Sequence, residues 1–581
     1  MLMAGFMAGI VPAMGQEKLE ETLYVEGEYV PAVVRQDKIH LLPQKVSFEL
    51  PAVKPLTDKD LLTGRYEPRY VTLSPPVWRG ELAAYPWRGY LTAALGSYLN
   101  SNVSAGYRVS DNGTTRADVW LQHNSTSLFH PRMGEFDRDR TRYRYDEQIG
   151  FDLRHDMGKS GILGASLSYH LGLFNYYGAV AHSAESGKAP TQTLNDAFLR
   201  LHWRSAGKNG WQFGVRAEGG IFGYRSNYTV FDYEWQRWSG QREIQAGAGA
   251  EVWRRLTDNQ RLGIDVDFIN LSYNKVVKDG YSRSLQNIRI TPAYTFAGER
   301  FSARLGIEAD VTFGAGKGIH PEAPEMKSSK LHVAPSVRLS YDGGVWNASV
   351  SATGGQKMQT LRSGYELDYY QQPMLDYVMP TFVPVEATAR LEFGSSPKFR
   401  AGIDFTYATV RHLYQGGWYM SELSNYMEDA ADFDPLHCNL SGYSIGVDAQ
   451  WSPISLLTLR GRGTWQPQRQ GSTTGFFNGY DRPRWTADAE AIVRPIDALE
   501  LTVGYRYRGV RNIFRRYGET QESYGEHLPD ICNLSFGARY RLSRTVTFFG
   551  KADNLLGKRI IVLPCQPAEG FNFLVGADVI F

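Results

Sequence analysis

The residues best suited to hold a metal ion lie in one acidic stretch of the sequence. Glu428, Asp429, Asp432 and Asp434 place four carboxylates close together, and hard oxygen ligands at this density can bind Ca²⁺. The same composition is typical of a solvated surface loop, so both interpretations stay open. The Gly-rich segment 314–318 resembles a phosphate loop in composition only, because it lacks the GxxxxGK[ST] spacing and precedes no predicted helix.

Nucleophilic catalysis would need a nucleophile and a base on neighbouring elements. The sequence holds 12 histidines and many serines, but no spacing singles out one set. Cys438, Cys532 and Cys565 are too few and too scattered for a zinc cluster. We therefore expect neither an enzyme nor a bound cofactor. A net charge of +2 gives no sign of a nucleic-acid partner.

Charged residues alternate with apolar ones in three segments near the C-terminus, at 459–465, 485–491 and 499–508. Alternation with a period of two puts the charges on one face of a strand. If Trp465 lies opposite Trp485 at the outer lipid boundary, antiparallel pairing sets the whole register. The predicted result is a mixed-charge ladder facing the lumen of a barrel, with Arg460 opposite Glu490, Arg462 opposite Asp488, Asp488 opposite Arg506, and Arg508 beside them.

The elements that would carry this ladder run from Gly89 to Phe581. Alternating segments of 10–15 residues recur there, and their connections are short and long in turn, as at 206–210 and 227–241. Transmembrane barrels show this alternation of turns and loops. A stretch of about 18 apolar residues, as a membrane helix needs, is absent beyond residue 15. We predict an all-β fold, a closed antiparallel transmembrane β-barrel of about 22 strands (20–22), surrounded by outer-membrane lipid.

The N-terminal part of the chain has a different composition. Residues 1–15 are apolar and small, as in a secretory signal peptide. Residues 16–87 hold eight prolines, a density that leaves little room for long helices or central strands. We predict a signal peptide at 1–15, a short Pro-rich periplasmic or lumenal arm at 16–87, and the barrel at 88–581.

The C-terminal segments resemble known outer-membrane proteins. Phe571, Phe573 and Phe581 share one apolar face that ends in a terminal aromatic residue. This face resembles the last strand of bacterial outer-membrane proteins, which the barrel-assembly machinery recognises. Segment 546–560 resembles the penultimate strand of TonB-dependent receptors, a strand that closes with the motif Asn554, Leu555 and Leu556.

The N-terminal motifs narrow this resemblance. VEGEY at 25–29 and GYLTAALGSYLN at 89–100 are similar to a plugless, TonB-receptor-like barrel family of the Bacteroidetes type. The resemblance implies transport across the bacterial outer membrane, and the mixed-charge lumen predicted above favours a polar solute. The alternative is a scaffold or accessory barrel in an assembly or export complex. Either the long outer loops or a partner protein or lipoprotein would close the lumen, and the use of TonB stays open.

The strand count also suggests one disulfide. It places Cys532 and Cys565 on the outer side of the membrane, an oxidising environment where disulfides persist. Their segments are two strands apart, so we predict that a bridge between Cys532 and Cys565 is the most favourable pairing.

Overall fold

The fold is that of a computed structural model. It describes residues 87–129, 142–175, 191–207, 209–231, 234–274, 284–314, 329–367, 380–396, 398–420, 431–467, 470–471, 483–516, 523–563 and 566–581. The predicted signal peptide and all of the predicted arm except Trp87 lie outside these residues.

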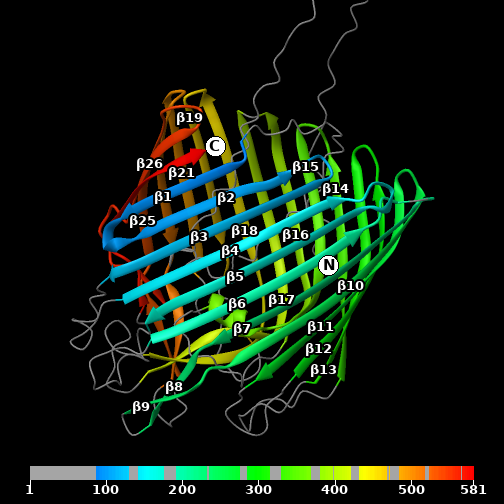
Figure 1. Ribbon diagram of the computed structural model, residues 1–581, viewed down its shortest axis with the longest axis horizontal. Coiled ribbons are helices and arrows are strands. Elements are labelled where there is room, and N and C mark those ends of the chain that lie inside the picture. The colour runs from blue at the N-terminus through cyan, green and yellow to red at the C-terminus, as the bar shows by residue number, and fades with distance from the viewer. Residues whose placement is uncertain are drawn as a thin grey trace, which may run out of the picture. The chain divides into compact units, whose positions relative to one another are not determined.

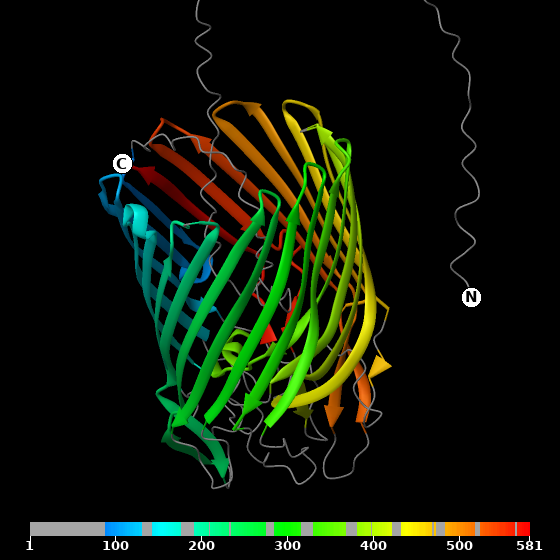
Figure 2. The same cartoon turned by 90° about the vertical axis from the view of Figure 1, so that its right-hand side faces the viewer.

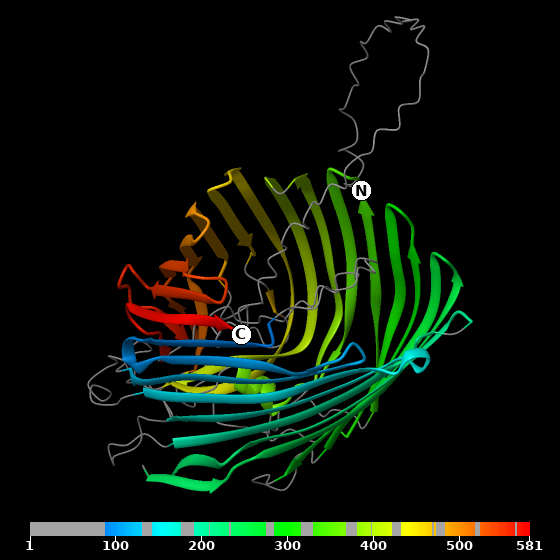
Figure 3. The ribbon, with the colours of Figure 1, turned by 45° about the horizontal axis from the view of Figure 1, so that its top comes forward.

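One antiparallel sheet curls round until its first and last strands pair (Figures 1 and 3). The sheet holds 25 strands, and three short ones, β20 (Gln470–Gly471), β23 (Arg511–Arg516) and β24 (Ser523–Leu528), are additions at the end that carries the long connections. The other 22 close the ring, with Leu91 of β1 opposite Val579 of β29. The prediction of a closed antiparallel barrel of about 22 strands is confirmed.

Each strand of the ring pairs with the next one along the barrel. The bounds are β1 (Gly89–Gly96), β2 (Ser101–Asp111), β3 (Thr115–Phe129), β4 (Arg142–Asp156), β5 (Ile162–Asn175), β6 (Thr191–Arg204), β7 (Trp211–Tyr224), β10 (Arg242–Thr257), β11 (Gln260–Asn274), β12 (Ser284–Ala297), β13 (Phe301–Phe313), β14 (Ser329–Asp342), β15 (Trp346–Lys357), β16 (Thr381–Ser396), β17 (Phe399–Met420), β18 (Ala431–Ile454), β19 (Leu457–Trp465), β21 (Trp485–Ile496), β22 (Leu499–Arg508), β25 (Ile531–Arg541), β26 (Val546–Asp553) and β29 (Asn572–Ile580).

The long connections contain structure that periodicity did not predict. The β17–β18 hairpin is longer than the predicted segments of 10–15 residues and continues to the pair Met420 and Ala431. Two further hairpins lie at this end, β8 (Ser226–Phe231) with β9 (Glu234–Ser239), and β27 (Ile561–Leu563) with β28 (Gln566–Pro567). Beyond the bilayer both faces of a hairpin meet water, so its strands need not alternate between polar and apolar residues.

A short helix, α3 (Leu361–Leu367), lies inside the ring of strands (Figure 2). It contacts Asp146, Asp196 and Glu243 of three different strands, which identifies the face that points into the lumen. Because side chains alternate along a strand, the pairing register carries this assignment from strand to strand around the barrel. Among the described residues no helix is long and apolar enough to cross a membrane.

The opposite face of the same strands is apolar and exposed. Leu167 is 51% exposed and Ile307 is 54% exposed, values that a soluble sheet would reduce by packing another layer on it. A belt of such residues around a closed ring, with charged residues inside, is the architecture of an outer-membrane β-barrel. Its members include Leu121, Ile149, Leu163, Leu199, Leu201, Val215, Ile221, Ile264, Val333, Val350, Ile403, Val447, Val503 and Val575.

We predict that a charge on this belt destabilises the barrel. Leu167→Arg places a cation on the lipid face in the middle part of β5 and should lower the free energy of unfolding by about 2–4 kcal/mol. The measurement is guanidinium unfolding of the refolded barrel in lipid vesicles. Ser168→Arg is the matched control, because Ser168 points into the lumen between Gly150 and Phe198, away from lipid, and its substitution should cost much less. Equal losses in the two variants would contradict the assignment of the faces.

Candidate functional site

The predicted ladder residues lie on the inner wall in the predicted register. Trp465 is opposite Trp485, Arg462 is opposite Asp488, and Arg460 is opposite Glu490. Across the next turn, Asp488 is opposite Arg506 and Thr486 is opposite Arg508. The indole rings of Trp465 and Trp485 lie 6.1 Å apart on the lipid face.

The ion pairs extend the ladder beyond directly opposite residues. Arg460 lies 3.6 Å from Glu490, and Asp488 accepts from Arg506 at 3.3 Å and from Arg508 at 3.0 Å. Arg462 does not pair with Asp488 in the described side chains. It reaches the other way, to Asp404 at 3.0 Å and Asp448 at 3.5 Å.

Two glycines make room for contacts between side chains that lie two strands apart. A Cβ at Gly446 would lie 2.6 Å from Asp404 Oδ2, and one at Gly402 would lie 2.6 Å from Arg390 Nη2. With hydrogen in place of a side chain, Asp404 reaches over β18 to Arg462. Arg390 likewise reaches over β17 and donates to Asp448 at 2.8 Å.

The result is a four-residue network, Arg390–Asp404–Arg462–Asp448, that spans strands β16 to β19. Arg390 also donates to Asp404 at 3.2 Å and to Glu392 at 2.7 Å. The Asp404 side chain is 7% exposed, whereas that of Asp488 is 45% exposed. Charge-assisted bonds around a shielded carboxylate are stronger than those around an exposed one.

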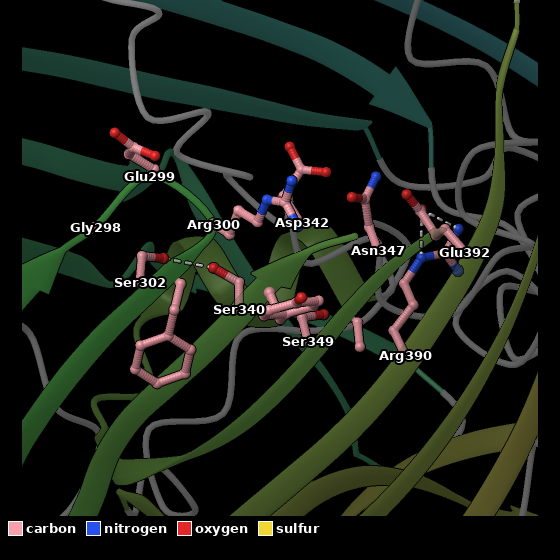
Figure 4. A pocket seen from close by; sticks show the side chains of 13 residues that line it. Gly298, Glu299, Arg300, Ser302, Ser340, Asp342, Asn347, Ser349, Arg390 and Glu392 are labelled. Carbon is pink, nitrogen blue, oxygen red and sulfur yellow. Dashed lines mark hydrogen bonds and ion pairs between the residues drawn. The ribbon is translucent and has the colours of Figure 1, made fainter. Parts of the chain in front are cut away.

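A polar cavity of about 480 Å³ lies at the end of the barrel that carries the short turns (Figure 4). Arg390 and Glu392 line one side of it, and Ser302 and Ser340, hydrogen-bonded at 2.5 Å, line another. The charge network therefore continues into a water-accessible recess at the periplasmic mouth.

The second cluster of the lumen holds α3 near the opposite mouth. The Leu361 amide donates to Glu243 Oε2 at 2.7 Å, and Arg362 pairs with Asp196. The Tyr365 hydroxyl donates to Asp146 Oδ1 at 3.3 Å. Burial, and after it the nearby Asp146 carboxylate, raise the pKa of Tyr365, so its hydroxyl stays a neutral donor.

Aromatic packing reinforces these polar anchors. The Tyr365 ring lies 6.4 Å from that of Phe174 and 6.1 Å from that of Phe222, and the Arg362 guanidinium lies 4.9 Å over Phe198. Although α3 belongs to the connection between β15 and β16, it rests on β4, β5, β6, β7 and β10. The described first part of the connection, up to Leu367, therefore leaves β15 and lies against strands on another part of the wall.

Sequence reasoning missed this helix, although a local signal exists. Thr360 and Ser363 cap its start reciprocally, since the Thr360 amide donates to Ser363 Oγ at 2.8 Å and the Ser363 amide donates to Thr360 Oγ1 at 3.0 Å. Such a box of hydroxyl residues three apart marks a helix start. The sequence does not show which carboxylates of the wall contact the helix, because the closed barrel brings those distant strands to it.

The penultimate-strand motif forms a turn at the outer end of β26. Asn554 is fully buried with a positive φ of 52°, a conformation that asparagine tolerates. Its side chain bonds both ways with the Lys558 backbone, at 2.8 and 3.1 Å. Leu555 and Leu556 are 40% and 46% exposed.

The remaining predicted residues are those of the last strand, the cysteines and the acidic stretch. Phe571, Phe573 and Phe581 are about half exposed on or beside β29. Cys532 is buried with a free thiol, and Cys565 lies outside the described residues, so the bridge stays a prediction. Glu428 and Asp429 lie outside them too, and Asp432 and Asp434 are described only as backbone of β18. The Ca²⁺ site therefore also stays a prediction.

Comparisons with known proteins show the fold and nothing finer. No family model and no curated protein sequence matches the chain. Solved structures of TonB-dependent receptors do. They include the FrpB iron transporter from Neisseria meningitidis, at 11% identity and TM-score 0.64 over 90% of this chain and 83% of that one.

Two more have the same architecture. The copper transporter OprC matches at 11% identity and TM-score 0.62, over 85% of this chain and 80% of that one. A mutant of the ferric enterobactin receptor PfeA from Pseudomonas aeruginosa matches at 12% identity and TM-score 0.62 over the same shares.

We predict that the shielded carboxylate of the network contributes more stability than the exposed one. Asp404→Ala leaves Arg390 and Arg462 short of an acceptor and should lower the free energy of unfolding by about 1–3 kcal/mol. Asp488→Ala removes a more exposed carboxylate and should cost at most about 1 kcal/mol. Guanidinium unfolding in lipid vesicles measures both, and the reverse order would contradict the network.

Proposed function

We propose that this chain is a bacterial outer-membrane barrel that transports a polar solute through its lumen. The observation that carries the proposal is the connection bearing α3, which is folded into the lumen and held there by Asp146, Asp196 and Glu243. A barrel of this width cannot be filled by its own inward side chains, so a segment anchored across it would control passage.

The chemistry of the wall supports a polar cargo. The described inner face carries cations and anions in alternation, as in Arg390, Asp404 and Arg462. Such a surface keeps the lumen hydrated and gives neither sign of charge an advantage. The similar solved structures are named as transporters of iron and copper and as a ferric enterobactin receptor, which supports transport and leaves the solute of this chain open.

Partners follow from the same proposal. The resemblance to TonB-dependent receptors supports a periplasmic contact with TonB, and the plugless, Bacteroidetes-type resemblance supports a partner protein or lipoprotein at the lumen or the outer loops. The scaffold alternative gains no support from the part of the chain that the structure describes.

The last strand supports recognition by the barrel-assembly machinery. The Phe581 carbonyl accepts from the amides of Arg88 and Gly89 at 2.8 and 2.7 Å, and its ring stacks on Tyr107 at 6.4 Å. The residue therefore joins the end of the chain to the first strand while 55% of it stays exposed.

The gating role of α3 predicts the outcome of a charge exchange. Arg362→Asp or Asp196→Arg puts like charges together at the anchor and should release α3, so single-channel conductance in planar bilayers should rise several-fold. The double variant restores the pair with its charges exchanged and should return conductance towards that of the wild type.

The control for this exchange is Arg204→Asp, at the far end of the strand that carries Asp196, where it also places like charges together because Arg204 pairs with Glu251. It should leave conductance unchanged. Swelling of proteoliposomes in sugars of increasing size then tests the cargo class, since released variants should admit polar solutes. Unchanged conductance in both single variants would overturn the gating role, and a lack of swelling in all of them would overturn polar-solute transport.

Recognition of the last strand predicts a difference between cells and purified components. Phe581→Ala should lower the amount of folded barrel in cells several-fold, while refolding into detergent micelles changes little. Heat-dependent migration on denaturing gels reports the folded fraction in both settings. Phe548→Ala, an exposed aromatic on β26, is the control. An equal loss in micelles would point to stability in place of recognition.

A further inference from the structure

Three polar residues form a chain of hydrogen bonds on the outward face of adjacent strands. Ser101 Oγ on β2 lies 2.7 Å from His123 Nε2 on β3. His123 Nδ1 lies 2.5 Å from Glu147 Oε1 on β4. A hydroxyl, an imidazole and a carboxylate joined in this order are the components of a nucleophile, a general base and the group that orients the base.

The carboxylate determines which way the protons point. An ionised Glu147 only accepts, so the neutral imidazole of His123 carries its hydrogen on Nδ1. Its Nε2 is then the acceptor, and Ser101 donates to it. Ser125 Oγ lies 2.6 Å from Ser101 Oγ, and because the Ser101 hydrogen is engaged by His123, Ser125 is the donor of that bond.

The pairing register places the set on the lipid side. His123 is directly opposite Glu147 and Val103. His123 lies two positions along β3 from the exposed Leu121, and Glu147 lies two positions along β4 from the exposed Ile149. Since two residues on one strand share a face, the three polar groups continue the lipid belt towards the outer rim.

The surface around the serine is apolar and open. Leu95, the partner of Ser101 on β1, is 67% exposed, and Leu99 is 59% exposed. The His123 and Glu147 side chains are 23% and 40% exposed. A hydrocarbon chain lying on this surface would place its polar end at Ser101.

The turn before Ser101 holds an uncommon backbone conformation. Tyr98 and Leu99 have φ values of 58° and 49°, in the left-handed region that costs roughly 1–2 kcal/mol for each non-glycine residue. The Tyr98 hydroxyl donates to the Phe571 carbonyl at 3.2 Å, and the Gly96 amide donates to the Asn100 carbonyl at 2.8 Å. These bonds hold the tight turn, and with it the position of Ser101 beside the base.

We propose that Ser101, His123 and Glu147 form a serine esterase site that hydrolyses the acyl ester of a membrane lipid at the outer rim of the barrel. The site is separate from the lumen, because it lies on the opposite face of the wall. It is thus independent of the transport proposal, and it differs from the expectation from sequence that the chain is not an enzyme.

The reaction follows from the order of the hydrogen bonds. Ser101 Oγ attacks the ester carbonyl carbon while His123 Nε2 takes the hydroxyl proton, and Glu147 stabilises the imidazolium that forms. The Ser125 hydroxyl is within reach of the developing oxyanion. His123 then returns the proton to the departing alcohol oxygen, which leaves an acyl-Ser101.

Water completes the cycle. His123 removes a proton from a water molecule, which attacks the acyl carbon and releases the fatty acid, and the proton returns to Ser101 Oγ. The products are one fatty acid and one lysolipid or alcohol for each ester and water consumed.

The first test is labelling of the refolded barrel in micelles with an alkyl fluorophosphonate. Peptide mass spectrometry should find the label on Ser101. Ser101→Ala should abolish it, and His123→Ala should lower the labelling rate by about 10²-fold or more. Ser104→Ala, on the lumen face of the same strand, is the control and should label as the wild type does. Heat-dependent gel migration verifies that each variant is folded.

The second test is hydrolysis in vesicles, with released fatty acid measured by mass spectrometry. Release from phosphatidylethanolamine vesicles identifies a glycerophospholipid as substrate, and release only from lipid A-containing vesicles identifies an acylated glucosamine. Labelling of Ser101 together with either release supports the site. Absence of label on Ser101, absence of release from both vesicles, or release that persists in folded Ser101→Ala overturns it.

Glu147 acts through His123 and is a positioning residue. Its test therefore measures kcat and KM separately, because a loss of packing alone would not lower kcat at constant KM. Glu147→Gln should lower kcat on the order of 10²-fold or more while KM stays constant. Glu147→Asp should recover part of the rate. A rise in KM at constant kcat, or no recovery by aspartate, would overturn its assigned role.

Discussion

Every feature of this molecule depends on closure of the sheet between its first and last strands. In a bilayer each unpaired backbone amide or carbonyl costs several kcal/mol, so a sheet with a free edge cannot span it. Here β1 and β29 pair along their length, and the Phe581 carbonyl takes the amides of Arg88 and Gly89 at the seam. Once the ring is closed, the alternation of side chains sends every strand residue either to lipid or to the lumen.

The inner wall shows how charged residues are accommodated under that constraint. Glycines at 402 and 446 let long side chains reach over a strand, so that Arg390 and Arg462 share the carboxylates of Asp404 and Asp448. Other carboxylates of the wall, at Asp146, Asp196 and Glu243, receive groups of α3. The wall therefore neutralises itself on one side and holds an inserted segment on the other.

The pairing register that sets the residues of the inner wall also sets those of the outer face near the rim. Asn102, Asn124 and Asp146 point inward, while Ser101, His123 and Glu147, one residue away on the same strands, point outward. A transmembrane barrel one residue thick can therefore hold two separate polar sites back to back, one in water and one at the lipid boundary.

The sequence by itself determined the barrel, the strand number, the two faces and the register of the charge ladder, because each depends on period-2 alternation and on short turns, which are local. Only the tertiary structure decided which carboxylates Arg462 reaches, where α3 rests, and that Ser101 meets His123 and Glu147. Those contacts join residues far apart in the chain. They depend on the tilt of the strands and on which neighbouring residues are glycine. The position of a residue along its own strand does not give its distance from side chains on other strands, which is set only when the barrel closes.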